Sequence, residues 1–176
     1  MSIIVFCESS SFPEGNAATN RIHTYAKGFI ENGKNVHVIS FANKYISNGN
    51  GVTNGIYFYH PFGQKKRNKY FLIRRWQKFI KYFRTIRLAN EINKKDKIVV
   101  FNCWTGQLFT QFFIFILAKS LNSKIVLERN EHPLRNYQSS IFKKKLGESK
   151  VALETKMCDG IFCISQYLID FYKKET

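Results

Sequence analysis

Residues 10–41 read SSFPEGNAATNRIHTYAKGFIENGKNVHVISF, and this stretch decides the fold class. A loop containing one proline and one glycine leads into residues 17–32, whose apolar positions recur at helical spacing, and Gly33 marks the expected helix end. The apolar run at residues 35–41 then predicts a β-strand. Another apolar run, Ser2–Cys7, precedes the loop, so the N-terminal part predicts one strand–loop–helix–strand unit.

The same alternation continues to the end of the chain. Short apolar runs predict further strands at residues 56–60, 97–102, 124–129 and 160–165. Helical patterns separate them at residues 69–93, 105–121, 141–156 and 166–173, whereas residues 46–55, ISNGNGVTNG, predict a loop rich in turns. Strands that alternate with helices pair in parallel through right-handed crossovers. We therefore expect one doubly wound, mainly parallel α/β domain of the Rossmann-like kind over residues 1–176.

Ligands of doubly wound folds bind beyond the carboxyl ends of the strands. This rule selects the segments that directly follow the predicted strands, which are residues 8–20, Asn43, residues 102–106, residues 128–135 and residues 165–166.

The loop after the first strand lacks the two common phosphate-binding motifs. A dinucleotide site needs G-x-G-x-x-G there and an acid ending the second strand, but the loop has only Gly15 and the second strand ends in SFANK. No P-loop motif occurs either, which argues against nicotinamide and NTPase chemistry. Gly15 permits close backbone approach to a ligand, Asn16 or Thr19 caps a helix whose amides favour an anion, and Arg21 adds a charge. The same residues fit a capped turn without a ligand equally well.

Positive charge is concentrated in one segment of this chain, whose formal net charge is +16. Residues 65–87 contain ten basic residues and no acid, and such density attracts anionic lipid, nucleic acid or phosphorylated substrates. We expect the apolar stripe of this helix to pack on the sheet, and its basic side to bind an anionic membrane or to be simply solvated. The stripe comprises Leu72, Trp76, Phe79, Ile80, Phe83 and Ile86, and the expected membrane-binding residues are Arg74, Arg75, Lys78 and Lys81.

Other features narrow the protein class. The cysteines, Cys7, Cys103, Cys158 and Cys163, show no metal-ligand spacing, so we expect reduced thiols and no metal. The most apolar segment, residues 108–121, is too short to span a bilayer, and the N-terminal apolar run is too short for a signal peptide. We expect a cytoplasmic protein, peripheral at the inner face of the membrane.

Three segments together resemble the N-terminal domain of GT-B glycosyltransferases of family 4. FPEGNAATNRIHTYAKGFIENGKNVHVISF is similar to the loop, helix and strand of that domain, with Lys34 and Asn35 where Gly-His is usual. CDGIFCISQYLIDFYKK resembles the end of that domain, including Asp159 and Ser165, and LERNEHP resembles an acidic loop in some bacterial members. The likeness lies in the order and spacing of the segments along the whole chain.

The resemblance implies an activity. Family members are retaining enzymes that use nucleotide sugars without a metal, so this chain would be the acceptor-binding half of an enzyme of bacterial surface polysaccharide synthesis. The donor's diphosphate would lie under the loop of Gly15, Asn16 and Arg21. The second domain, with its paired glutamates, is expected outside these residues, and we expect residues 1–176 alone to be inactive.

Candidate residues also follow the later strands. Glu131 and His132 bind sugar hydroxyls or carry a proton, or else form a solvated turn. Arg129 binds a phosphate or pairs with Glu128 or Glu131, and Ser165 caps the last helix in preference to contacting a ligand. Further candidates for substrate contacts are Asn102 and Trp104, the latter as a stacking wall or a partly buried loop aromatic.

A rival interpretation explains the charge differently. A non-enzymatic module that binds nucleic acid or other anions would also carry +16 charges. The basic residues, however, lie on a predicted helix without a recognisable nucleic-acid motif.

Overall fold

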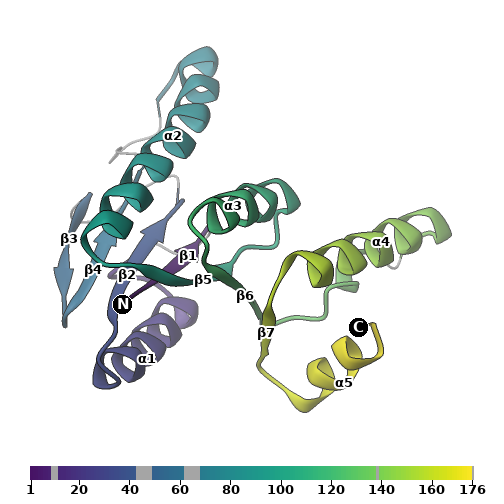
Figure 1. The fold of residues 1–176 in the computed structure, drawn as a ribbon. Coiled ribbons are helices and arrows are strands. Elements are labelled where there is room, and N and C mark those ends of the chain that lie inside the picture. Colours follow the sequence, from purple (N-terminus) through teal and green to yellow (C-terminus); the bar gives the residue numbers. More distant parts are fainter. Residues whose placement is uncertain (9–11, 43–48, 62–67, 138, 176) are drawn as a thin grey trace. The chain divides into compact units, whose positions relative to one another are not determined.

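The computed structural model describes residues 1–8, 12–42, 49–61, 68–137 and 139–175 (Figure 1). Asn43 and the basic residues 65–67 lie outside these ranges. The described residues form two compact units, Met1–Phe101 and Asn102–Thr176, and each is described by itself.

The first unit is a β-sheet with a helix on each face (Figure 1). Its central strands β1 (Ser2–Cys7) and β2 (Asn35–Ser40) pair in parallel from Ser2 opposite Asn35 to Cys7 opposite Ser40. All six residues of β1 are buried, as expected for a strand that helices cover on both faces. The covering helices are α1 (Ala17–Glu31) and α2 (Phe71–Lys95).

One edge of this sheet corrects the prediction of a loop at residues 46–55, of which residues 46–48 lie outside the described ranges. Residues Asn50–Thr53 form a strand, β3, which pairs antiparallel with β4 (Ile56–Tyr59). Asn54 and Gly55 connect them with φ values of 48° and 79°. Both angles are positive, as a two-residue hairpin turn requires, and Asn-Gly is the sequence that adopts it most readily. A hairpin therefore stands where the density of turn residues predicted only a loop.

The expected end of the first helix is confirmed at Gly33. Its φ is 71°, and its N–H donates to the carbonyl of Ile30 at 2.9 Å. The next N–H, of Lys34, reaches the carbonyl of Phe29 at 3.0 Å. This left-handed glycine cap turns the chain directly into β2.

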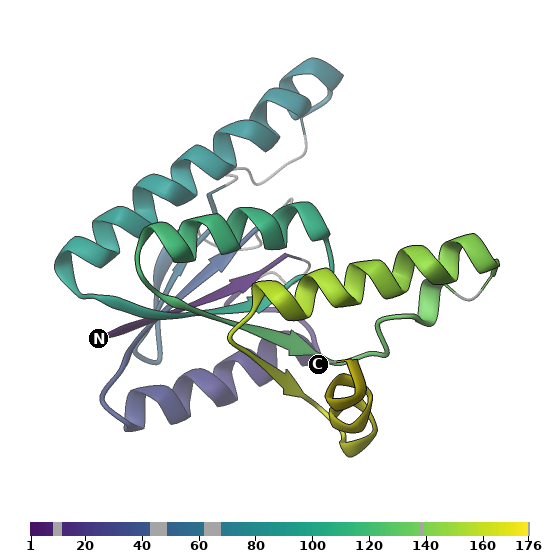
Figure 2. The same cartoon turned by 45° about the vertical axis from the view of Figure 1, so that its right-hand side comes forward.

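The second unit continues the alternation. Strand β5 (Ile98–Trp104) begins in the first unit and ends in the second, where β6 (Lys124–Arg129) and β7 (Gly160–Cys163) pair in parallel. Helices α3 (Leu108–Ser120) and α4 (Ile141–Met157) lie on one side of these strands, and α5 (Gln166–Glu175) lies on the other (Figure 2). The strand order is β3-β4-β2-β1-β5-β6-β7, which confirms the mainly parallel α/β fold class.

A short 3-10 helix, Arg135–Tyr137, packs against α4 at Gly147. A Cβ atom at Gly147 would meet Leu134 Cδ2 and Tyr137 Cγ at 2.8 Å each. The absence of a side chain at this one helical position therefore lets the segment after β6 lie directly on α4.

Candidate functional site

The loop that follows β1 is held by two histidines of the first unit. His60 Nε2 lies 2.6 Å from the carbonyl oxygen of Phe12, and His23 Nε2 lies 2.9 Å from that of Pro13. The buried Phe12 ring also stacks on His23, with ring centroids 4.5 Å apart. Burial lowers the pKa of His60, although the bond to Phe12 raises it, so the ring is a neutral donor to the carbonyl at physiological pH.

This anchored loop presents Gly15 and Asn16 at the start of α1. Both residues are exposed, and Asn16 is the helix cap, because its Oδ1 accepts from the N–H of Ala18 at 3.1 Å. The structure therefore confirms one of the two predicted caps. Arg21 points along the helix instead, since its Nη2 donates to the hydroxyl of Tyr25 at 3.2 Å. Its expected contact with an anion at the first turn stays a prediction.

Lys81 lies in an unexpected place. Its side chain is only 7% exposed, and its Nζ is 4.3 Å from the centroid of the Phe41 ring, directly after β2. Burial lowers the pKa of Lys81, while the charge of Glu8, directly after β1, raises it. The prediction that Lys81 faces a membrane is therefore wrong, because the ammonium group lies at the carboxyl ends of β1 and β2.

The apolar stripe of α2 also has the opposite orientation to the predicted one. Leu72, Trp76, Phe79 and Phe83 are between 58% and 79% exposed. The buried side of the helix is formed instead by Lys81, Thr85, Ala89 and Ile92. The larger apolar residues of the stripe remain outside. Arg75 and Lys78 are exposed, and Arg74 is half-buried with its Nη1 bonded to the carbonyls of Asn68 and Lys69.

In the second unit, Arg129 has several polar partners. Its Nη2 pairs with Glu154 Oε2 at 2.8 Å, its Nε donates to the hydroxyl of Tyr172, and its Nη1 donates to the carbonyls of Thr105 and Glu128. Burial is the largest single influence and lowers the pKa of the Arg129 guanidinium, but Glu154 and Tyr172 together outweigh it, so that pKa is raised. The ion-pair partner is thus Glu154, not Glu128 or Glu131 as considered from the sequence.

The other candidates in this unit have simpler surroundings. Trp104 Nε1 donates to Asn102 Oδ1, so these two β5 side chains hold each other, with Asn102 buried and Trp104 half-buried. Glu131 is exposed and pairs with Arg135 at 3.2 Å, whereas His132 Nδ1 accepts from the N–H of Leu134 at 3.2 Å. Glu131 and His132 therefore use separate partners.

Ser165 has the role that the sequence favoured. Its Oγ accepts from the N–H of Leu168 at 3.4 Å, which confirms it as a cap of α5.

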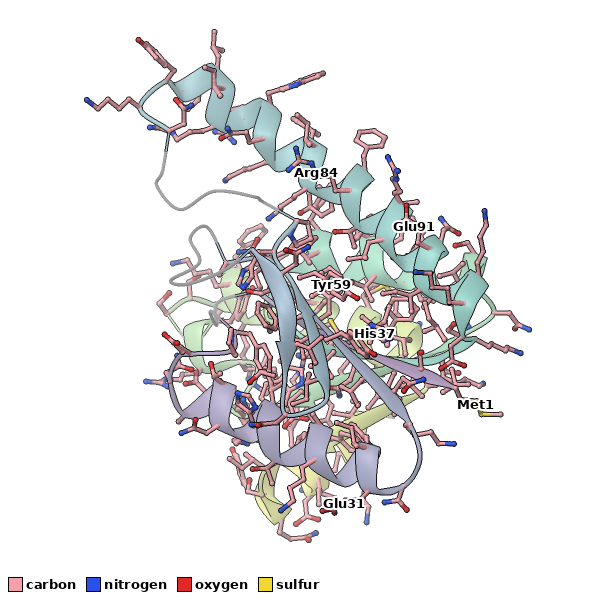
Figure 3. The ribbon with its side chains drawn as sticks, turned by 90° about the vertical axis from the view of Figure 1, so that its left-hand side faces the viewer. Met1, Glu31, His37, Tyr59, Arg84 and Glu91 are labelled. Atoms are coloured by element: carbon pink, nitrogen blue, oxygen red, sulfur yellow. The ribbon has the colours of Figure 1, made fainter. Side chains whose placement is uncertain are left out.

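A pocket of about 490 Å³ opens at the other end of the strands of the first unit. His37, Tyr59 and Glu91 line it (Figure 3). The pKa of His37 is lowered to about 4, because burial lowers it and the negative charge of Asp96 offsets only part of that decrease. Asp96 itself binds the N-terminal amine at 2.7 Å, Ser2 Oγ at 2.8 Å and Asn35 Nδ2 at 2.8 Å. Because this pocket lies near the amino ends of β1 and β2, it is not at the ligand-binding edge that the fold predicts.

Within the described residues, no group of three or more His, Cys, Asp or Glu side chains is arranged to hold a metal ion. Among the helices that the structure describes, none is both long and apolar enough to cross a membrane.

No protein-family profile and no curated protein matches the sequence. Among solved structures, the chain is similar to sucrose-phosphate synthase from Thermosynechococcus elongatus, with a TM-score of 0.67, 8% identity, and coverage of 99% of this chain and 45% of that one. The chain thus spans less than half of that protein. This likeness confirms the expected Rossmann-like α/β fold of GT-B glycosyltransferases.

Two further structures are also similar. One is an alpha-glucosyltransferase solved with UDP and a 13-mer DNA containing a central A:G mismatch, at TM-score 0.49, 16% identity, and coverage of 94% and 37%. The other is the catalytic domain of starch synthase IV from Arabidopsis thaliana bound to ADP and acarbose. Its TM-score is 0.44 and its identity 15%, and the match covers 72% of this chain and 33% of that one. At these scores neither adds to the argument.

Proposed function

We propose that this chain is the acceptor-side half of a retaining glycosyltransferase that moves a sugar from a nucleotide-sugar donor to a glycan or lipid-linked acceptor. The observation that carries the proposal is the likeness to a glycosyltransferase-type fold along 99% of the chain. The context would be bacterial surface polysaccharide synthesis, as the family 4 resemblance implies. No metal is needed in this proposal.

Each unit would contribute its own carboxyl edge. The loop of Gly15 and Asn16 offers exposed backbone and the amides of a capped helix to an anionic group. Glu131 and His132, on the segment after β6, would bind or deprotonate the acceptor. A donor-binding domain beyond these 176 residues would supply most of the donor contacts.

The central test measures transfer of labelled sugar from a panel of nucleotide sugars to a glycolipid fraction. We expect no multi-turnover transfer by residues 1–176 alone, and transfer when the donor-binding half is present. Turnover by the 176 residues alone would contradict this division of roles. If the complete protein shows no transfer and does not bind a nucleotide, the proposed activity is refuted.

Two sets of variants test the site in the complete enzyme. Gly15→Val should lower activity at unchanged thermal stability, because a branched side chain blocks close approach to the backbone. Glu131→Gln and His132→Ala should lower turnover with little change in nucleotide affinity. If Glu131→Gln and His132→Ala both keep wild-type rates, these two residues form only a solvated turn.

We further propose that the outer face of α2 binds an anionic membrane surface. Figure 3 shows the first turns of α2 reaching beyond the strands of the same unit. The exposed stripe of Leu72, Trp76, Phe79 and Phe83 runs along this part, with exposed Arg75 and Lys78 on the same helix. A helix with aromatic residues on one side and basic residues beside them is typical of an interfacial helix.

The exposed aromatic stripe and the basic residues of α2 together favour a lipid bilayer over other anionic partners. Exposed aromatic side chains gain free energy by entering the headgroup boundary, and each nearby basic residue adds about 1 kcal/mol at an anionic surface. Nucleic acid would use the charges but leave the stripe in water. A lipid surface therefore accounts for both features of α2.

Vesicle co-sedimentation tests this surface. We expect binding to anionic vesicles, weak binding to neutral ones, and loss of binding in a triple variant with Trp76, Phe79 and Phe83 changed to Ser. The control changes the exposed Phe109 and Phe112 of α3 to Ser. The rival anion-binding module would be favoured if the control loses vesicle binding equally. It would also be favoured if the triple variant still binds both DNA and vesicles.

A further inference from the structure

Lys81 is a buried cation, and the part of the chain that the structure describes does not neutralise it by direct pairing. Among the residues that the structure describes, none forms a hydrogen bond or ion pair with its Nζ. Its neighbours are the rings of Phe41 and Tyr82, at 4.3 Å and 5.3 Å from the ammonium to each centroid. These contacts are attractive, but within the described ranges they give the donors of the ammonium no oxygen acceptor.

The charges around Lys81 leave it with one acidic neighbour. Glu8 raises the pKa of Lys81, whereas Lys78 lowers it. None of the residues outside the described ranges has an acidic side chain, so those segments supply no further carboxylate. Burying an ammonium group without a hydrogen-bonded partner is unfavourable, and such a group gains free energy when an anion reaches it.

The position of Lys81 indicates what kind of anion. The ammonium lies at the residues directly after β1 and β2, where ligands of doubly wound sheets bind. A lysine in such a place acts as a compact point charge toward phosphate oxygens. The capped N-terminus of α1 follows the same strand β1 and provides backbone amides at the same edge.

We propose that Lys81 binds a phosphate group of a substrate at the carboxyl ends of β1 and β2. Phosphate is the chemistry shared by the diphosphate of a nucleotide sugar and by a phosphorylated acceptor. The inference rests on the proposed function and deepens it, but binding is measurable without glycosyl transfer, so the two can fail separately. It also gives this one lysine of the basic helix a role different from that of its exposed neighbours.

Calorimetric titration of the 176-residue chain with inorganic pyrophosphate, UDP and geranyl diphosphate tests the proposal. We expect Lys81→Met to weaken binding by at least about tenfold, the loss typical of one charge-assisted hydrogen bond. The control is Lys94→Met, an exposed lysine near the other end of the same helix, and it should stay within about twofold. Tighter binding of UDP than of geranyl diphosphate would assign the site to the donor, and the reverse order to the acceptor.

A second measurement uses the unchanged protein. The ¹⁵N resonance of Lys81 Nζ should shift when pyrophosphate is added, so the test does not depend on whether Lys81→Met folds. Equal affinity of wild type and a folded Lys81→Met variant, or no shift of the Nζ resonance at saturating pyrophosphate, would overturn the proposal.

Discussion

Arg129 and Lys81 are equally buried, at 7% exposure each, but the protein treats their charges in different ways. Arg129 has a carboxylate at 2.8 Å, a tyrosine hydroxyl at 3.2 Å and two carbonyl oxygens. Lys81 has two aromatic rings and the more distant influence of Glu8. The first charge is satisfied by the protein alone, and the second is available to a ligand.

His37 shows a third solution. It is also buried, but burial lowers its pKa to about 4, so it is neutral near pH 7. Pairing, loss of charge and ligand binding are thus the three ways in which this chain accommodates a basic group in its interior. The difference teaches that burial of a basic residue does not reveal its role until its hydrogen-bond partners are known.

The largest effect is expected when the partner of Arg129 is removed. Glu154→Gln leaves the guanidinium buried without a counterion, and we expect a loss of about 3–5 kcal/mol in the free energy of unfolding. Urea denaturation measures this change. Glu148→Gln, at an exposed acid of the same helix, is the control and should change stability by less than about 0.5 kcal/mol.

A smaller effect is expected when the charge of Arg129 is kept but its shape is changed. Arg129→Lys retains the pair with Glu154, but one ammonium group cannot reach Tyr172, Thr105 and Glu128 together. We expect a loss of about 1–3 kcal/mol in the same urea experiment. A variant as stable as wild type would show that the ion pair alone accounts for the role of Arg129.

Lys81→Met should behave in the opposite way to the changes at Arg129. No carboxylate hydrogen-bonded to Lys81 is left behind among the described residues, so we expect the free energy of unfolding to stay within about 1 kcal/mol of wild type or to rise. A loss as large as that of Glu154→Gln would show that Lys81 supports the fold and would remove the contrast between the two residues.

A separate effect concerns pH. The pKa of His37 is lower in the folded protein than its ordinary value of 6.5, so stability is complete above pH 6.5 and falls as the pH decreases toward 4. Thermal unfolding between these values should show this slope, and His37→Gln should reduce it. An unchanged slope in that variant would assign the pH dependence to other groups.

The sequence predicted most of the elements, because every strand except β3 (Asn50–Thr53) contains a short apolar run and the helices were recognised from their own patterns. It failed where two outcomes share one pattern. The periodicity of α2 identified an apolar stripe, but it did not show which side faces the sheet. The structure buries the side with Thr85 and Ala89. The prediction for Lys81 failed with it.

The site residues were harder to predict because their partners are distant in the chain. Glu154 is 25 positions from Arg129, and only folding brings them together. Asn16 and Ser165 were predictable as caps, since capping depends on neighbours within three residues. Local chemistry was therefore accessible from the sequence, whereas long-range pairing was not.

Gly147 has a consequence for how the sequence of this protein can change over time. Glycine inside a helix normally invites replacement by alanine, which favours the helix by about 1 kcal/mol. Here the first added carbon would meet Leu134 and Tyr137 at 2.8 Å. A deep mutational scan should therefore find position 147 among the least tolerant of α4, and shortening Leu134 alone should not make alanine acceptable, because Tyr137 Cγ and Cβ would still lie at 2.8 and 2.9 Å.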